Sequence, residues 1–338
     1  MNNNPEIAGA VQAEPDADPD SADSELRDRL IAVRDEIGKV IVGQDAVITG
    51  LLTALLTRGH VLLEGVPGVA KTLMVKAFAA ALDLEFGRVQ FTPDLLPSDV
   101  TGQLILDPET GRFEYREGPV FTNVLLGDEM NRTTPKTQAA LLEAMEERQV
   151  TVGGTTRRLP DPFMVVATQN PVEYEGTYPL PEAQLDRFLF KLNVDYPTPE
   201  QERAVLRRHD AGLDPHDLAA AGVRPSASAA DVSAARRAIT RVQVEARVVD
   251  YIVELVIATR NSPSLSLGVS PRGATAVLHA AKAWAWLSGR NFVTPDEVKS
   301  VARPAMRHRV LLRSEVMLDG GDADRVIDGV LASVPVPR

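Results

Sequence analysis

Residues 61–82, VLLEGVPGVAKTLMVKAFAAAL, constrain the fold of this chain more than any other stretch. An apolar run typical of a buried strand comes first, a turn that contains Gly65 and Gly68 follows, and an alanine- and leucine-rich helix begins at Lys71. This order places backbone N–H groups at a helix N-terminus, where they can bind phosphate. The spacing matches the phosphate-loop pattern G-x-x-x-x-G-K-[ST], except that Ala70 replaces the second glycine.

The side chains at the start of this helix have the chemistry that a bound nucleotide needs. Lys71 can reach the β- and γ-phosphates, and the Thr72 hydroxyl can ligate Mg²⁺. Ala70 adds one methyl group to the loop, which is harmless if its φ is negative and its Cβ points away from the phosphate. A chance match to the pattern remains open for this stretch alone, so the interpretation needs further residues.

The first part of the chain alternates between apolar strands and helical stretches, which predicts a parallel sheet covered on both faces. The predicted strands cover residues 61–64, 85–91, 122–127, 163–168 and 188–194. Two segments interrupt this alternation as predicted hairpins: residues 104–118 turn at D-P-E-T-G, and residues 148–160 turn at Gly153-Gly154.

Beyond residue 197 the pattern is helical. The predicted helices lie near residues 198–209, 229–240, 245–260, 271–288 and 322–333, and a further helix opens at a capping box formed by Thr294 and Glu297. The sequence therefore predicts an α/β domain over residues 26–197 and a small all-helical domain over residues 198–338.

Residues 1–25 contain seven acidic residues and no lysine or arginine, so they contribute −7 of the formal net charge of −11. We expect a disordered acidic tail there, because such a segment cannot bury enough apolar surface to fold. The rest of the chain is not basic enough to suggest a nucleic-acid binder. The chain has no cysteine, its five histidines show no metal-ligand spacing, and no apolar run is long enough to cross a membrane. A signal-peptide pattern is absent at the N-terminus, so we expect a cytoplasmic protein without membrane insertion.

Polar residues follow two further predicted strands. Asp128 and Glu129 come directly after an apolar run, and Asn170 ends the next one. Ligands of open parallel sheets bind at the carboxyl ends of strands, so these residues are expected beside the phosphate loop. Arg187 precedes the fifth strand. Arg272 lies in the first turn of a helix, where the helix dipole disfavours a cation, which indicates an anionic partner such as phosphate.

Taken together, these segments resemble the MoxR family of AAA+ ATPases. The family's phosphate loop reads G-x-P-G-x-A-K-T, which GVPGVAKT matches, so Ala70 is the residue expected there. The stretches FTPDLLPSDVTG, GPVFTNVLLGDEMNR, ATQNP, LPEAQLDRF and SPRG also resemble family motifs. The resemblance covers about residues 26–335, with Gly127 in place of an expected alanine. It implies an AAA+ P-loop sheet of five parallel strands sandwiched by helices, with hairpin insertions, followed by a helical lid domain.

The resemblance also implies roles for individual residues. Asp128 and Thr72 would organise Mg²⁺, Glu129 would be the catalytic base, and Asn170 the first sensor. Arg187 would be the arginine finger that acts on the neighbouring subunit, and Arg272 the second sensor. The residues implied to contact ATP are Val42, Gly43 and Gln44 at the adenine, and Gly65, Val66, Pro67, Gly68, Val69, Ala70, Lys71, Thr72 and Asp128 at the phosphates and Mg²⁺.

Three functions are compatible with this pattern. The leading one is a chaperone-like ATPase, assembled as a ring, most simply a hexamer, that remodels protein complexes during maturation or metal insertion together with a von Willebrand factor A domain partner. The second is a nucleic-acid motor, for which Arg157 and Arg158 at the second hairpin are a weak basic footprint. The third is a scaffold that binds ATP with little turnover, and the presence of Glu129 argues against it.

Overall fold

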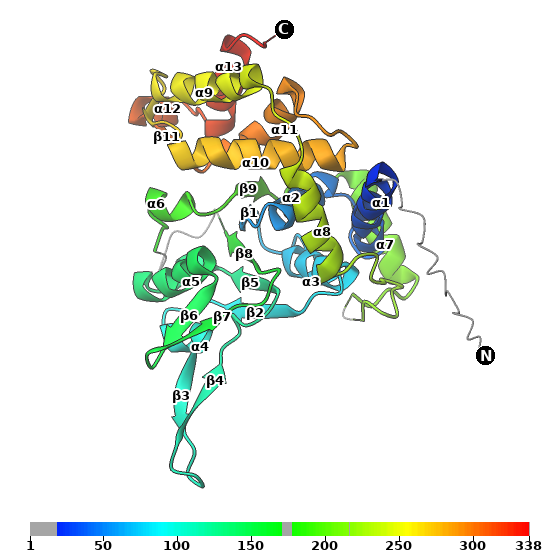
Figure 1. The fold of residues 1–338 in the computed structure, drawn as a ribbon, viewed down its shortest axis with the longest axis vertical. Helices are drawn as coiled ribbons and strands as arrows, with labels where there is room; N and C mark the ends of the chain where they lie inside the picture. Colours follow the sequence, from blue (N-terminus) through cyan, green and yellow to red (C-terminus); the bar gives the residue numbers. More distant parts are fainter. Residues whose placement is uncertain (1–18, 171–177, 216, 338) are drawn as a thin grey trace, which may run out of the picture.

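The computed structural model describes residues 19–170, 178–215 and 217–337. At its centre lies a five-stranded sheet in which all neighbouring strands run parallel (Figure 1). In spatial order the strands are β2 (Phe86–Gln90), β5 (Val124–Asp128), β8 (Met164–Gln169), β1 (Val61–Glu64) and β9 (Phe190–Asn193). The predicted parallel sheet of five strands is confirmed.

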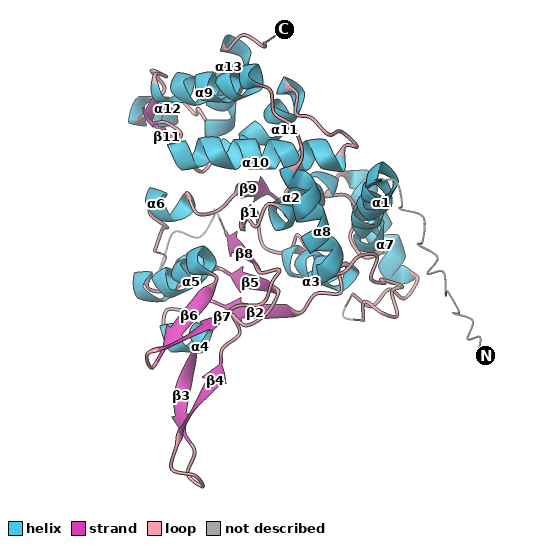
Figure 2. Cartoon of the chain, viewed as in Figure 1, coloured by secondary structure: helices cyan, strands magenta, loops and turns pink. Residues whose placement is uncertain are grey.

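Helices cover both faces of the sheet because successive residues of each strand point to opposite sides. On one side, Leu62 packs in an apolar cluster with Leu141 and Met145. On the other side, Val61 and Leu63 belong to a larger cluster. Helix α5 (Pro135–Glu147) contributes to the first cluster, and α1 (Pro19–Gly38), α2 (Asp45–Leu56) and α3 (Lys71–Ala81) contribute to the second (Figure 2).

Both predicted hairpins are present. The first pairs β3 (Gly102–Leu106) with β4 (Phe113–Glu117) and extends away from the body of the molecule, after the short helix α4 (Pro97–Thr101) (Figure 1). The second pairs β6 (Gln149–Val152) with β7 (Thr155–Arg158). The guanidinium of Arg157 lies 4.0 Å from the ring centroid of Tyr115, so the base of one hairpin rests against the other.

The remainder of the chain is mostly helical, as predicted. Its helices are α6 (Glu182–Leu185), α7 (Pro199–Asp210), α8 (Ala229–Thr240), α9 (Ala246–Arg260), α10 (Pro271–Leu287), α11 (Pro295–Met306), α12 (Ser314–Leu318) and α13 (Ala323–Ser333). The capping box of Thr294 and Glu297 opens α11 as predicted. A small antiparallel pair, β10 (Leu265–Leu267) with β11 (Leu311–Leu312), was not predicted.

The helical part shares a continuous apolar core with the sheet. Val232 and Ala235 of α8 are buried in the same cluster as Leu30 of α1 and Leu51 of α2. The three helices lie side by side in Figure 1. A division at residue 197 therefore does not separate two cores, and it remains a proposal about domain organisation.

The N-terminal helix extends into the segment that was expected to be disordered. Helix α1 starts at Pro19, so the expected disorder over residues 1–25 is wrong for residues 19–25, and residues 1–18 lie outside the described part. Acidic side chains in the first turns of a helix are favoured by its dipole. Asp23 also forms an ion pair with Arg241 (2.7 Å). Among the described helices, none has both the length and the apolar composition to cross a membrane.

Candidate nucleotide-binding site

The loop between β1 and α3 is packed against the end of β9, which explains its first glycine. A Cβ on Gly65 would lie 2.5 Å from the carbonyl oxygen of Val194, so a side chain there would displace backbone. Val194 is itself fixed, because its N–H donates to the Glu64 carbonyl (2.8 Å). Gly68 has a φ of 84°, which glycine adopts without steric cost. The loop geometry therefore depends on both glycines.

Ala70 does not have the negative φ that would make it harmless. Its φ of 59° and ψ of 27° place it in the left-handed region, at the N-cap of α3, where its carbonyl accepts a hydrogen bond from the Met74 N–H (2.9 Å). A residue with a Cβ pays roughly 1–2 kcal/mol for this conformation. The condition of a negative φ is thus not met: the loop keeps the backbone geometry of a glycine and accommodates the alanine with strain.

A cavity of about 430 Å³ opens between this loop and the carboxyl ends of β5 and β8. It brings together the predicted residues Pro67, Gly68, Ala70, Lys71, Thr72, Asp128, Glu129 and Asn170. Leu73, Lys76, Thr168 and Pro215 complete its lining and were not predicted. Gly65, Val66 and Val69 belong to the same loop but do not line the cavity. Motifs that are about 40 to 100 residues apart in sequence thus share one concave site, at the end of the sheet where ligands bind to parallel sheets.

Lys71 lies inside the loop, with its Nζ donating to the Gly65 carbonyl (2.5 Å). Burial lowers the pKa of the Lys71 ammonium, and the attraction of Asp128 and Glu129 opposes that shift. The ammonium is therefore within electrostatic reach of both carboxylates and of any anion in the cavity.

Asp128 is held by partners on both neighbouring strands. Its Oδ1 accepts a hydrogen bond from the Thr168 hydroxyl on β8 (2.6 Å), and its Oδ2 accepts one from Arg88 on β2 (2.7 Å). The Thr168 hydroxyl oxygen also accepts the backbone N–H of Glu129 (2.9 Å). Thr168 thus fixes the carboxylate and the turn that follows it at once.

Glu129 is restrained in a similar way. Its backbone is left-handed, with a φ of 57°, and its Oε2 accepts a hydrogen bond from Gln90 on β2 (2.8 Å) and pairs with Arg132 (3.0 Å). Sequence reasoning missed Arg88 and Gln90. Their signal is the alternation of polar residues in RVQ, because residues two apart on a strand share a face.

Asn170 lines the same cavity as the two candidate metal ligands, Thr72 and Asp128. Asn170 is buried at the end of β8 and lines the cavity. Within the described residues, no group of three or more histidine, aspartate and glutamate side chains could hold a metal ion. Mg²⁺ in nucleotide sites typically takes one or two protein oxygens, together with phosphate oxygens and water. The Thr72 hydroxyl and the Asp128 carboxylate suit that sparse set of donors.

The turn of Val42, Gly43 and Gln44 lies outside this cavity but contacts the segment against which the phosphate loop packs. Gln44 donates from Nε2 to the Asp195 carbonyl (3.0 Å), and Asp195 follows the residue that contacts Gly65. Gly43 has a φ of 75°, which glycine adopts without steric cost, and it lies against the end of the Gln201 side chain. The turn and the phosphate loop therefore both contact the segment that follows β9, and the adenine-binding role of the turn stays a prediction.

Arg187 and Arg272 line a different cavity, of about 220 Å³. Both pair with Glu146 at the end of α5: the Arg272 guanidinium donates to Oε2 (2.5 Å), and Nε of Arg187 lies 3.5 Å from the same oxygen. The hydrogen bond from Arg272 lowers the pKa of Glu146. The anionic partner inferred from the position of Arg272 is thus a carboxylate in this chain. The structure brings the two arginines together, away from the cavity that holds Lys71.

Comparisons with known proteins agree with this geometry. A family model described as "ATPase family associated with various cellular activities (AAA)" matches residues 60–190, and one described as "AAA lid domain" matches residues 257–330. The chain is 49% identical to YeaC of Bacillus subtilis over 90% of this chain and 93% of that protein. It is 43% identical to "Chaperone MoxR1" of Mycobacterium tuberculosis over 90% of this chain and 81% of that protein. The crystal structure of a Cytophaga hutchinsonii protein proposed to be an ATPase superimposes with a TM-score of 0.86 at 43% identity, covering 94% of this chain and 98% of that one.

Proposed function

Because the chain belongs to the MoxR family of AAA+ ATPases, we propose that it hydrolyses ATP to ADP and phosphate with Mg²⁺ as the metal ion. The observation that carries the proposal is the cavity shared by Lys71 and Thr72 with Asp128, Glu129 and Asn170. These residues supply a cation for the phosphates, oxygen ligands for the metal and a carboxylate for the attacking water.

Each side chain has a separate task in the proposed reaction. Lys71 and the loop N–H groups bind the phosphates, and Thr72 and Asp128 hold Mg²⁺, which neutralises charge on the phosphate oxygens. Glu129 orients the attacking water and accepts its proton. Asn170 contacts the γ-phosphate or that water. Gln90 restrains Glu129 before the nucleotide is in place, since it occupies Oε2 of the carboxylate.

The second part of the proposal is a ring, most simply a hexamer. Arg187 and Arg272 lie together outside the phosphate cavity of their own subunit, so we assign both to the nucleotide of the neighbouring subunit. A guanidinium there would stabilise charge that develops on the transferred phosphoryl group, which in related phosphoryl transfer contributes on the order of 10³–10⁵ in rate. Val42, Gly43 and Gln44 would hold the adenine.

In the cell, the ring would remodel protein complexes during maturation or metal insertion, in the cytoplasm and together with a von Willebrand factor A domain partner. The relative named as a chaperone supports a protein client. A nucleic-acid client gains little support, because Arg157 at the second hairpin stacks on Tyr115 instead of projecting freely, and the net charge of the chain is −11.

Steady-state ATPase measurements on purified variants test the reaction. Lys71→Ala should weaken ATP binding, whereas Glu129→Gln should bind ATP normally and lose hydrolysis, because it removes only the group that handles the water. Turnover by the Glu129→Gln protein at the parent rate would refute the assignment of the site.

A mixing experiment tests the ring. Arg187→Ala should bind nucleotide normally and be almost inactive, and adding Lys71→Ala protein should restore part of the activity. Mixed interfaces pair an intact phosphate site with an intact Arg187, which neither variant alone can do. Activity per chain should also rise with protein concentration. Constant activity across dilution to a demonstrated monomer, with no rescue in the mixture, would show that Arg187 does not act on a neighbour.

A further inference from the structure

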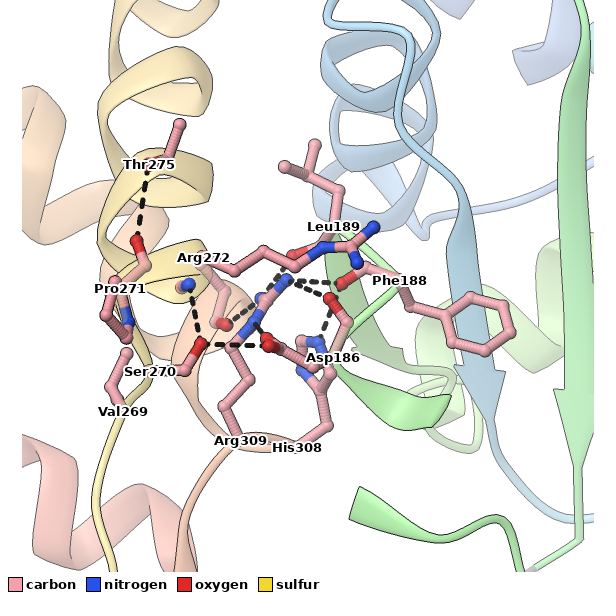
Figure 3. Close-up of polar contacts among 12 residues, drawn as sticks. Asp186, Phe188, Leu189, Val269, Ser270, Pro271, Arg272, Thr275, His308 and Arg309 are labelled. Carbon is pink, nitrogen blue, oxygen red and sulfur yellow. Dashed lines mark hydrogen bonds and ion pairs between the residues drawn. The ribbon is translucent and has the colours of Figure 1, made fainter. Parts of the chain in front are cut away.

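Arg309 lies just after α11 and ties the helical part of the chain to the segment that carries Arg187 (Figure 3). Its side chain is 2% exposed. Its Nε donates to Oδ1 of Asp186 (2.6 Å), and its terminal nitrogens donate to the carbonyls of Phe188 (2.7 Å), Leu189 (3.0 Å) and Asp186 (3.1 Å). A buried guanidinium is costly unless its donors are satisfied, and here every partner except the Ala305 carbonyl comes from the residues on either side of Arg187.

The second oxygen of the same carboxylate is bound by the helix that carries Arg272. Ser270, the N-cap of α10, donates its hydroxyl to Oδ2 of Asp186 (2.8 Å) and accepts the Gly273 N–H (3.1 Å) (Figure 3). Asp186 and Arg187 are adjacent in sequence, and Ser270 lies two residues before Arg272. The Asp186 carboxylate therefore fixes the backbone beside one arginine to the backbone beside the other.

Glu146 also links the two arginines, because its carboxylate pairs with both guanidinium groups. It pairs with Arg272 at 2.5 Å and with Arg187 at 3.5 Å, so one carboxylate screens the repulsion between two cations. Nε of Arg187 is buried and has no hydrogen-bond partner. Within the part of the chain that the structure describes, the Arg187 side chain donates no hydrogen bond, although it is 33% exposed. The Arg187 guanidinium therefore keeps hydrogen-bond donors that the described residues leave unused.

We propose that Asp186, Arg309 and Glu146 are positioning residues that hold Arg187 and Arg272 as a single two-arginine unit, directed at the phosphates of the nucleotide in the neighbouring subunit. The inference rests on the proposed ATPase ring and assigns a shared support to its two trans-acting arginines. It requires that loss of the Asp186 or the Glu146 carboxylate slows hydrolysis in the neighbouring subunit. Nucleotide binding by the altered subunit itself should remain intact.

The first test replaces Glu146, the exposed carboxylate that pairs with both arginines. Glu146→Gln keeps the size of the side chain and removes its charge, and Glu147→Gln, at the next exposed position of α5, is the matched control. We expect Glu146→Gln to lower kcat on the order of 10-fold to 100-fold, because small displacements of catalytic groups cost rates of this size. KM for ATP and the affinity for a fluorescent ATP analogue should stay within about twofold of the parent, as uniform binding is untouched. Glu147→Gln should match the parent in all three measurements.

The second test replaces Asp186, whose side chain is partly buried, and then mixes variants. Asp186→Asn should show the same loss of kcat with retained binding. Adding Lys71→Ala protein, which has an intact two-arginine unit but no working phosphate site, should restore activity to either variant. Structural damage would not be rescued in this way. Unchanged or increased kcat in both carboxylate variants would overturn the inference, and so would a loss of ATP affinity that parallels the loss of kcat.

The activity of Arg187→Ala, measured alongside, distinguishes failure of the positioning role from failure of the proposed trans-acting arginine. If Arg187→Ala is inactive while Glu146→Gln and Asp186→Asn are fully active, the positioning role fails and the trans-acting arginine stands. If Arg187→Ala is itself fully active, the proposed trans mechanism fails, and the positioning role falls with it.

Discussion

Acidification should destabilise this protein through His60, a histidine buried between the start of β1 and the end of α5. Its Nδ1 accepts the Val165 N–H (2.9 Å), and its Nε2 lies 3.1 Å from the Met145 carbonyl. A neutral ring with its proton on Nε2 satisfies both contacts, whereas a protonated ring loses the acceptor that Val165 needs. Burial accordingly lowers the pKa of His60 to about 4.

The sign and size of the effect follow from this pKa. The folded-state pKa is below the unfolded value of about 6.5, so the unfolded chain binds the proton more readily and stability falls as the pH drops. The loss begins near pH 6.5 and levels off below about pH 4. Proton linkage therefore lowers the free energy of unfolding by about 2 kcal/mol between about pH 7.5 and about pH 5, and by about 3 kcal/mol in total.

Urea denaturation at these two pH values measures the loss, and a glutamine variant isolates it. His60→Gln can accept from Val165 through its carbonyl and donate to Met145 through its amide without titrating. We therefore expect it to lose about 2 kcal/mol less than the parent on acidification. His308 is also buried with a lowered pKa, but it is present in both proteins and cancels. His209→Gln, an exposed replacement, should retain the full loss. Equal losses in the parent and His60→Gln would refute the reasoning.

Two further changes test the loop and the N-terminus. Ala70→Gly should raise the free energy of unfolding by about 1 kcal/mol, because glycine adopts the φ of 59° without the strain of a Cβ, and thermal unfolding with no gain would argue against a left-handed Ala70. Deleting residues 1–18 should leave ATPase activity within about twofold and the melting temperature unchanged, because a segment of this acidic composition is not expected to fold. Deleting residues 1–24 should lower the free energy of unfolding by up to about 1 kcal/mol, since it also removes the first turn of α1 and the exposed pair of Asp23 with Arg241. A large loss of activity or melting temperature from the shorter deletion would show that the acidic segment is structural.

The fold could be predicted because its signals are local. The strands of the sheet are short apolar runs that end at polar residues, and α10 and α11 begin at caps that the sequence displays. The start of α1 could not be placed, because composition describes a whole segment and an acidic stretch can be either a solvated tail or the first turn of a helix. The pair β10–β11 was missed since its strands are three and two residues long and depend on a partner far away in sequence.

The site was predictable to the extent that its residues follow strands. Lys71, Asp128 and Asn170 meet because the carboxyl ends of parallel strands lie at one edge, so topology alone brings them together. The φ of Ala70 could not be read from the residue type, because the surrounding loop determines it. The partners on β2 were missed for a related reason. By residue type, Arg88 and Gln90 are typical of the solvent-exposed face of an edge strand. Their contacts with Asp128 and Glu129 depend on the pairing of β2 with β5, which the sequence does not reveal.

Arg272 shows where local physics predicts the type of partner but not its identity. A cation in the first turn of a helix is disfavoured by the dipole, so an anion nearby was expected, and one is present. The sequence suggested phosphate, whereas the structure supplies Glu146, which also pairs with Arg187. This arrangement separates the cations of the site into two groups. Lys71 lines one cavity, and the two arginines, neutralised in part by one carboxylate, line another. In the proposed ring, the nucleotide of the neighbouring subunit would supply the phosphate that this pair of arginines can bind.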